Sequence, residues 1–310
     1  MSTSISVDRG STELAPSEVM RPAPWVFGLS AVVACLVLAA TLAGLLWDTG
    51  DASRMVTSVR GETVELYADG LYRHDTIFKG AANRGTDLVL LVAGVPLLVA
   101  GAFSYRRRSA RGSLLLAGVL GWVLYVYATL AIGTAYNELF LVYVALFGAA
   151  LAAFLGVLRS LDLRALESRL AKATPPRWVG WFLAIAGAFT AVMWTMPIVG
   201  GLLEGQPPAL LGTNTTLFTE ALDLAIIVPA VFIAARHLLR GRRVIGLVIA
   251  VPLLVLLAAL APTVIAQTVM QVEAGVAFTS AEIIGPISGF VVLGTTAGWA
   301  IYSMLRGLDA

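Results

Sequence analysis

The chain has 310 residues, of which 58% are hydrophobic and only 13% are charged. Its mean hydropathy is +0.86, and a water-soluble domain covers itself with far more charge than this. The composition therefore predicts an integral membrane protein. The formal net charge of +2 gives no reason to expect a nucleic-acid partner, because the basic residues form short clusters between apolar runs.

Eight apolar runs are long enough to cross a hydrocarbon layer of ~30 Å as helices of about 20 residues. The first run, 25–47, follows a polar N-terminal segment and is longer than the core of a signal peptide, so we expect a retained helix. The other runs lie at 86–104, 112–133, 138–158, 178–200, 217–236, 244–266 and 282–304. The predicted fold is an all-α membrane protein with eight transmembrane helices.

Arginine and lysine are concentrated in alternate loops. Basic clusters follow the second, fourth and sixth predicted helices, whereas the loops 134–137, 201–216 and 267–281 contain neither residue. Because cytoplasmic loops carry the excess of Lys and Arg, we expect both termini on the cytoplasmic side. The excess of arginine over lysine is typical of GC-rich bacteria, and the predicted location is a bacterial inner membrane. The outer loop 48–85 is mixed in charge, which is compatible with translocation.

This outer loop contains a local hairpin signal. Asp69-Gly70 lies between two β-prone segments, and an Asp-Gly pair is typical of two-residue turns because both central residues need positive φ. We therefore expect a small extracytoplasmic β-hairpin. The alternative is an irregular loop on the membrane surface.

The two halves of the chain share landmarks in the same order. Asp87 is followed nine residues later by Pro96, and Glu220 is followed nine residues later by Pro229. These and other matches predict two parallel four-helix repeats related by a pseudo-twofold axis along the membrane normal. The alternative is convergence of generic helix-end chemistry. The predicted organisation is a cytoplasmic tail at 1–22, a repeat at 23–162, a linker at 163–175 and a repeat at 176–310.

Several polar residues near the outer span ends are candidates for binding a small solute or ion. Asp223 leads this set because it lies about 10 Å inside its predicted helix, where a carboxylate must be protonated, paired or hydrated. A structural hydrogen bond from a neighbouring Thr, Tyr or Asn explains it equally well. The full set is Asp223, Glu220, Asp87, Glu138, Asn137 and Tyr136. For the acids that open predicted helices, capping is the alternative.

Signatures of metal and catalytic sites are missing from the sequence. His74 and His237 lie at opposite ends of the predicted topology and cannot ligate one metal or haem together, and the single cysteine, Cys35, has no partner. There is no Gly-rich phosphate loop and no nucleophile elbow. We expect no cofactor, no metal and no catalytic residue.

Small residues at four-residue spacing occur in the fourth and eighth predicted helices. Such spacing lets helices approach closely, so these faces are expected to meet other helices or a second protomer. The residues are Gly148, Ala152 and Gly156 in the fourth helix, and Gly285, Gly289, Gly294 and Gly298 in the eighth.

Three parts of the sequence resemble bacterial multipass membrane proteins of unknown function. They are 68–75 with 84–87, 133–141, and 219–224 with Pro229. The resemblance covers the first six predicted helices and implies no activity and no catalytic residue.

Three functions remain open, in order of preference. A permease for a small solute or ion is favoured by the doubled architecture and by Asp223. A non-catalytic sensor or assembly partner is favoured by the outer hairpin and by the scarcity of charge within the spans. An enzyme acting on lipid would use His74, Asp75 and Arg84, which serve equally well as loop contacts to an external ligand or as a solvated face.

Overall fold

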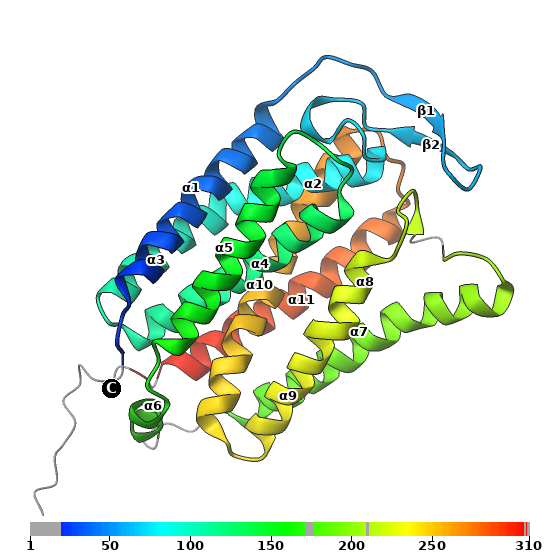
Figure 1. Ribbon diagram of the computed structural model, residues 1–310. Coiled ribbons are helices and arrows are strands. Elements are labelled where there is room, and N and C mark those ends of the chain that lie inside the picture. Colours follow the sequence, from blue (N-terminus) through cyan, green and yellow to red (C-terminus); the bar gives the residue numbers. More distant parts are fainter. Residues whose placement is uncertain (1–19, 171–175, 209–210, 307, 309–310) are drawn as a thin grey trace, which may run out of the picture.

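The computed structural model describes residues 20–170, 176–208, 211–306 and 308 (Figure 1). Within these ranges, eight helical segments are long and apolar enough to cross a membrane. The protein is therefore an all-α multipass membrane protein, as the composition predicts. Most of the predicted tail at 1–22 and residues 171–175 of the predicted linker lie outside the described residues.

The spans follow the chain in the expected order. They are α1 (Pro24–Leu46); α2 (Ile77–Val89), η3 (Leu90–Gly94) and α3 (Val95–Arg106) as one continuous helix; α4 (Ala110–Gly133); α5 (Phe140–Arg159); α7 (Arg177–Glu204); α8 (Phe218–Leu222), η5 (Asp223–Ile227) and α9 (Val228–Leu239) as one continuous helix; α10 (Arg243–Glu273); and α11 (Ser280–Leu305). A short amphipathic helix, α6 (Leu163–Leu170), follows α5.

The second span begins at Ile77 rather than near residue 86. The Thr76 side chain caps its first turn by accepting a hydrogen bond from the Lys79 backbone N–H. The following turns carry polar residues such as Asn83. These lower the local hydropathy, so the apolar run in the sequence begins later than the helix. Asp87 therefore lies ten residues inside a helix, and the prediction that it opens a helix is wrong.

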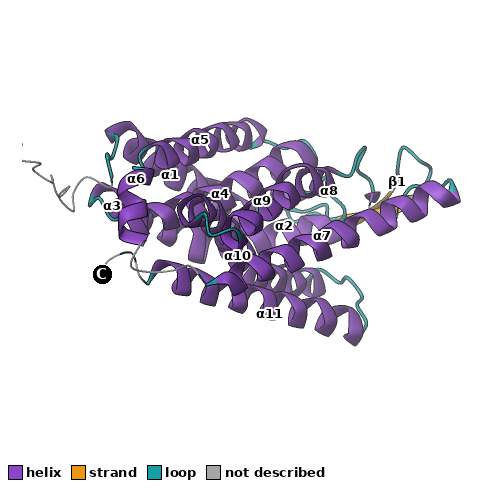
Figure 2. Cartoon of the chain, turned by 90° about the horizontal axis from the view of Figure 1, so that it is seen from below, coloured by secondary structure: helices purple, strands orange, loops and turns teal. Residues whose placement is uncertain are grey.

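Helices α4 and α10 form the centre of the bundle. α4 packs against α3, α5 and α10, whereas α10 packs against α2, α4, α9 and α11. In the view of Figure 2, α1 and α5 lie on one side of this central pair and α11 lies on the other. α4 is the most buried span, and α7 and α11 are the least buried.

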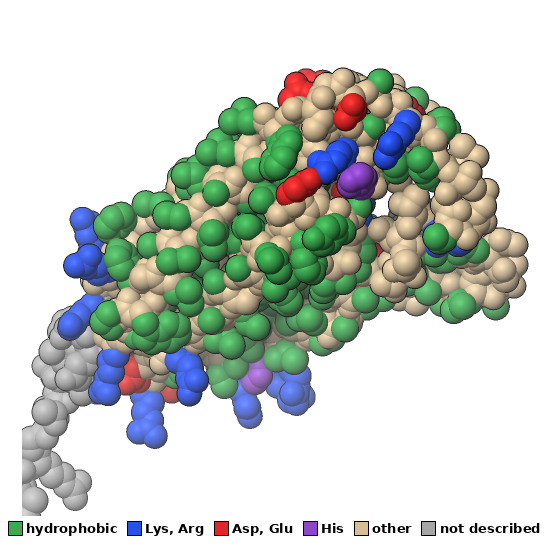
Figure 3. Space-filling view, turned by 45° about the horizontal axis from the view of Figure 1, so that its top comes forward, with side chains coloured by type: hydrophobic (Ala, Val, Ile, Leu, Met, Phe, Trp, Pro, Cys, Tyr) green, Lys and Arg blue, Asp and Glu red, His purple; other side chains and the backbone are tan. Residues whose placement is uncertain are grey.

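The two ends of the bundle differ in charge. Figure 3 shows Lys and Arg side chains gathered at one end, and acidic, basic and histidine side chains together at the other. We call the end formed by the loops 107–109, 160–162 and 240–242 the basic end. We call the opposite end, which carries the loop 47–76, the hairpin end.

The loop at the hairpin end contains a two-stranded antiparallel hairpin, but its turn differs from the predicted one. β1 (Arg54–Thr57) pairs with β2 (Thr63–Leu66), so the turn lies at 58–62. At the predicted turn, Asp69 has a φ of −113° and only Gly70 of the pair has a positive φ, +56°. A short 3₁₀ turn, η2 (Gly70–Tyr72), forms there instead. The reason is tertiary, because the Asp69 carboxylate accepts hydrogen bonds from the backbone N–H groups of Thr49 and Gly50.

A π-helical segment interrupts each of the two spans that carry Pro96 and Pro229. η3 begins three residues after Asp87, and η5 begins three residues after Glu220. Proline lacks an N–H and its ring crowds the carbonyl four residues earlier. For Pro96 and Pro229 these carbonyls lie inside the π-helical segments, whose wider turn accommodates the ring. Such segments are frequent at functional sites.

Candidate functional site

Asp223 is held by two aromatic side chains from other spans. The Tyr125 hydroxyl of α4 donates a hydrogen bond of 2.8 Å to Asp223 Oδ1. The Trp194 indole N–H of α7 donates one of 2.8 Å to Oδ2. Both donors are neutral, so the hydrogen bonds orient the carboxylate without cancelling a charge on it. The sequence also allowed a structural hydrogen bond to Asp223 from a neighbouring Thr, Tyr or Asn. The structure has such a bond from a tyrosine, together with one from a tryptophan.

Glu220 lies one turn before Asp223 on the same helix and is only 7% exposed. Among the described residues its carboxylate accepts no hydrogen bond from another side chain. Glu220 and Asp223 are three residues apart, so the two acids share one face of the helix. Two acids and a phenol therefore form one polar cluster, which with Trp194 lies between α4, α7 and the α8–η5 helix. We call these four residues the Asp223 cluster.

Asp87 occupies a more enclosed position and is only 1% exposed. The Tyr72 hydroxyl, from the 3₁₀ turn at the hairpin end, donates a hydrogen bond of 2.6 Å to Asp87 Oδ2. Gly44 of α1 is required at this place, because a Cβ there would collide with that oxygen. Burial and the neighbouring Asp87 raise the pKa of the Tyr72 phenol well above its usual value.

Three further polar side chains surround this pair. The hydroxyls of Tyr127 and Tyr143 and the amide nitrogen of Asn137 are buried and have no hydrogen-bond partner among the described residues. The two tyrosine rings lie 5.9 Å apart, and both hydroxyls lie near the Asp87 carboxyl. Asp87 is thus the centre of a second buried polar cluster. Tyr72 was absent from the predicted site because a loop residue gives no local signal that it enters the bundle.

The hairpin end is tied together by buried and half-buried ion pairs. Asp75 lies 3.3 Å from the Lys79 ammonium, and it accepts a hydrogen bond from the backbone N–H of Ala135. Lys79 also donates to the Asn214 side-chain oxygen at 3.0 Å and to the Gly133 carbonyl. Burial raises the pKa of Asp75, against the opposing effect of Lys79. This network joins three loops that are far apart in sequence.

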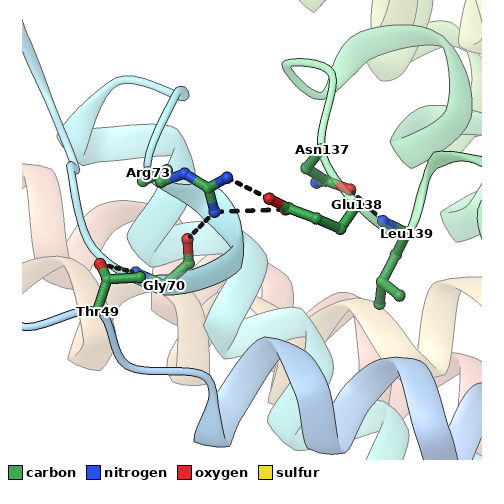
Figure 4. Close-up of polar contacts among 6 residues, drawn as sticks. All are labelled: Thr49, Gly70, Arg73, Asn137, Glu138 and Leu139. Atoms are coloured by element: carbon green, nitrogen blue, oxygen red, sulfur yellow. Dashed lines mark hydrogen bonds and ion pairs between the residues drawn. The ribbon is translucent and has the colours of Figure 1, made fainter.

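A second, more exposed ion pair is shown in Figure 4. Arg73 binds both carboxylate oxygens of Glu138, and it also donates to the Gly70 carbonyl at 3.1 Å. Arg73 lowers the pKa of Glu138. Beside it, the Asn137 side-chain oxygen accepts a hydrogen bond from the Leu139 backbone N–H. Glu138 therefore belongs to the loop network, and its carboxylate pairs with Arg73 and not with a residue of either buried cluster.

The remaining predicted contact residues have separate surroundings. His74 is exposed, and Tyr136 is 79% exposed. Arg84 donates to the Tyr67 hydroxyl and to the Leu45 carbonyl, which anchors the loop to the end of α1. His74, Asp75 and Arg84 thus each have different partners, which does not favour an enzymatic centre built from all three.

The bundle also contains hollows that are lined by neither Asp87 nor Asp223. A shallow hollow between α7 and α11 is lined by Trp178, Thr295, Thr296 and Trp299, and an apolar pocket lies between α3, α4, α10 and α11. Among the described residues, no group of three or more His, Cys, Asp or Glu side chains is arranged to hold a metal ion.

No protein-family model, curated protein or solved structure matches this chain. The function must therefore be argued from the two buried clusters and the helices that carry them.

Proposed function

We propose that this protein is a bacterial inner-membrane permease for a small solute or ion, with both termini in the cytoplasm and the hairpin end outside. The observation that carries the proposal is the pairing of Asp223 with Tyr125 and Trp194, which come from two other spans. A carboxylate inside a span is costly and marks ion or proton pathways by default.

The surroundings of Asp223 allow a cation or a proton to replace its hydrogen-bond donors. Its neutral donors leave the carboxylate free to bind a cation or a proton, and Glu220 adds a second acid one turn away. α7, which carries Trp194, is among the least buried spans, and a displacement of α7 relative to η5 would break the indole hydrogen bond. Asp223 is also the first residue of η5, where the irregular helix provides a place to bend.

The two proposed repeats would then have different roles. The π-helical segments at corresponding places, each followed by a proline, support a parallel duplication of four helices. In the first repeat the acid, Asp87, is sealed by Tyr72 and packs against Gly44. In the second repeat Glu220 and Asp223 lie beside α7, which is one of the two least buried spans. We infer that the first repeat is the scaffold and the second is the moving part.

A binding measurement tests this assignment. Purified protein is titrated separately with Na⁺, K⁺ and protons while tryptophan fluorescence is recorded, and Trp194→Phe identifies the contribution of Trp194. Occupation of Asp223 should weaken its hydrogen bond to the indole and change that contribution. Asp223→Asn should abolish the change, whereas Glu204→Gln at the exposed end of α7 should preserve it. An unchanged response in Asp223→Asn would contradict the proposal.

A sensor or assembly role is the second candidate. The observation that favours it is the network at the hairpin end, where Asp75, Lys79, Arg73 and Glu138 hold the loops in one arrangement suited to recognising a ligand or protein. In that case the solute would bind the loops, and the fluorescence change would not depend on Asp223.

A further inference from the structure

An apolar pocket of 340 Å³ lies between the two halves of the bundle. α3 and α4 form one wall, and α10 and α11 form the other. The side chains that line it include Val89, Leu97, Trp122, Val255, Pro262 and Ile301. Ser104 is the one hydroxyl among its lining residues, and it lies at the end of α3 nearest the basic end. The pocket is thus apolar along its length and polar at one end.

The pocket is long enough for one lipid acyl chain and too small for a helix. On the continuous second span, Val89 and Ser104 are fifteen residues apart, which corresponds to about 22 Å at 1.5 Å per residue. One leaflet of the hydrocarbon core is about 15 Å thick, so an extended acyl chain entering from the basic end is accommodated. Small residues on α3 and α4, Ala100 and Gly112 among them, leave room for a chain between the helices. A volume of 340 Å³ spread over this length is too small for a partner helix about 10 Å wide.

Positive charge lies at the polar end of the pocket. Arg107 and Arg108 are exposed in the turn between α3 and α4, and Arg306 is exposed at the end of α11. The Arg111 guanidinium donates a hydrogen bond of 2.6 Å to the Arg306 carbonyl, which holds these two helix ends together. Guanidinium groups at the membrane surface attract anionic headgroups and form strong hydrogen bonds with phosphate.

We propose that this pocket binds one acyl chain of an anionic phospholipid whose phosphate lies at Arg107, Arg108 and Arg306. The chain contacts α3 and α4 from one half and α10 and α11 from the other, so the lipid bridges the two halves at this pocket. This site is separate from the Asp223 cluster, and its existence does not depend on transport.

The first test compares lipid headgroups. Protein purified in detergent and stripped of lipid is placed in nanodiscs of phosphatidylcholine, with or without phosphatidylglycerol, and its thermal unfolding is recorded. We expect phosphatidylglycerol to raise the unfolding temperature. Arg107→Gln with Arg108→Gln should remove most of this increase and weaken phosphatidylglycerol binding roughly tenfold or more. The control pair, Arg240→Gln with Arg242→Gln at the same end, should retain it.

The second test locates the acyl chain. Phosphatidylglycerol brominated in the middle of its chains quenches nearby tryptophans, and Trp122 lines the pocket. Trp122→Phe should remove the quenching that saturates at low lipid content, whereas Trp299→Phe on the exposed face of α11 should not. Ala100→Trp, which places an indole in the pocket, should abolish the preference for phosphatidylglycerol. Val292→Trp, at a position that is 66% exposed, should keep that preference.

Two outcomes would overturn the proposal. One is equal stabilisation by phosphatidylcholine and phosphatidylglycerol. The other is an equal loss of quenching in Trp122→Phe and Trp299→Phe, which would indicate ordinary surrounding lipid only. The quenching test uses conservative variants, so it decides the question even if Ala100→Trp does not fold.

Discussion

Asp87 and Asp223 each accept a hydrogen bond from a tyrosine of another segment, yet they differ in how they are enclosed. Asp223 was predictable as a candidate because it is an acid well inside an apolar run, whereas its hydrogen-bond partners, Tyr125 and Trp194, come from other spans. The enclosure of Asp87 was not predictable. It depends on Tyr72, which reaches the bundle from a loop, and on the absence of a side chain at Gly44.

The Asp87 pair leads to a stability prediction. Gly44→Ala should lower the free energy of unfolding by about 1–3 kcal/mol, because the new methyl group collides with the Asp87 carboxylate. Gly28→Ala, on the same helix with open space around it, should change the unfolding temperature little. Thermal unfolding in detergent measures both. Equal effects of the two substitutions would show that Asp87 is not closely packed against α1.

At the scale of elements, the sequence predicted the existence and order of the spans better than their ends. The second span begins nine residues before its apolar run because its first turns are amphipathic and lie against other protein segments instead of lipid. For example, Gly85 packs directly against the backbone of Gln267 in α10. The hairpin turn was misplaced for a related reason, since contacts from Asp69 to Thr49 outweigh the local turn preference.

The loop network at the hairpin end should depend strongly on Lys79. Lys79→Met should destabilise the protein by about 3–5 kcal/mol, because it leaves Asp75 buried without its cation. Adding Asp75→Asn to Lys79→Met should restore much of the loss. Glu138→Gln should cost less than about 1 kcal/mol, since its ion pair with Arg73 is exposed to solvent. A double variant no more stable than Lys79→Met would show that the pair is not the source of the effect.

For the whole molecule, the distribution of Lys and Arg predicts which end is cytoplasmic. In a Cys35→Ala background, cysteines at Ser109 and Arg240 of the basic end should resist an impermeant thiol reagent in intact cells. A cysteine at Glu204, at the hairpin end of α7, should react. Labelling of Ser109→Cys from outside would reverse the proposed orientation.

We also propose that two copies of the chain associate through the small-residue faces of α5 and α11. Gly156 and Gly294 already pack within the chain, against Trp25 and Ala261. Gly148, Gly285 and Gly289 have open space around them and remain available for close contact. Cysteines placed at Gly285 should form a disulfide between protomers if the α11 faces meet.

The central claim is that Asp223 takes part in moving a solute or ion across the membrane. Protein reconstituted in proteoliposomes is tested for the flux of protons, Na⁺, K⁺ and a panel of small neutral and charged solutes. The wild type should show a flux that Asp223→Asn abolishes while the unfolding temperature stays nearly constant, because Asn retains the shape of the side chain. Loss of stability without any change of flux in Asp223→Asn, or no flux in the wild type across the panel, would contradict the claim.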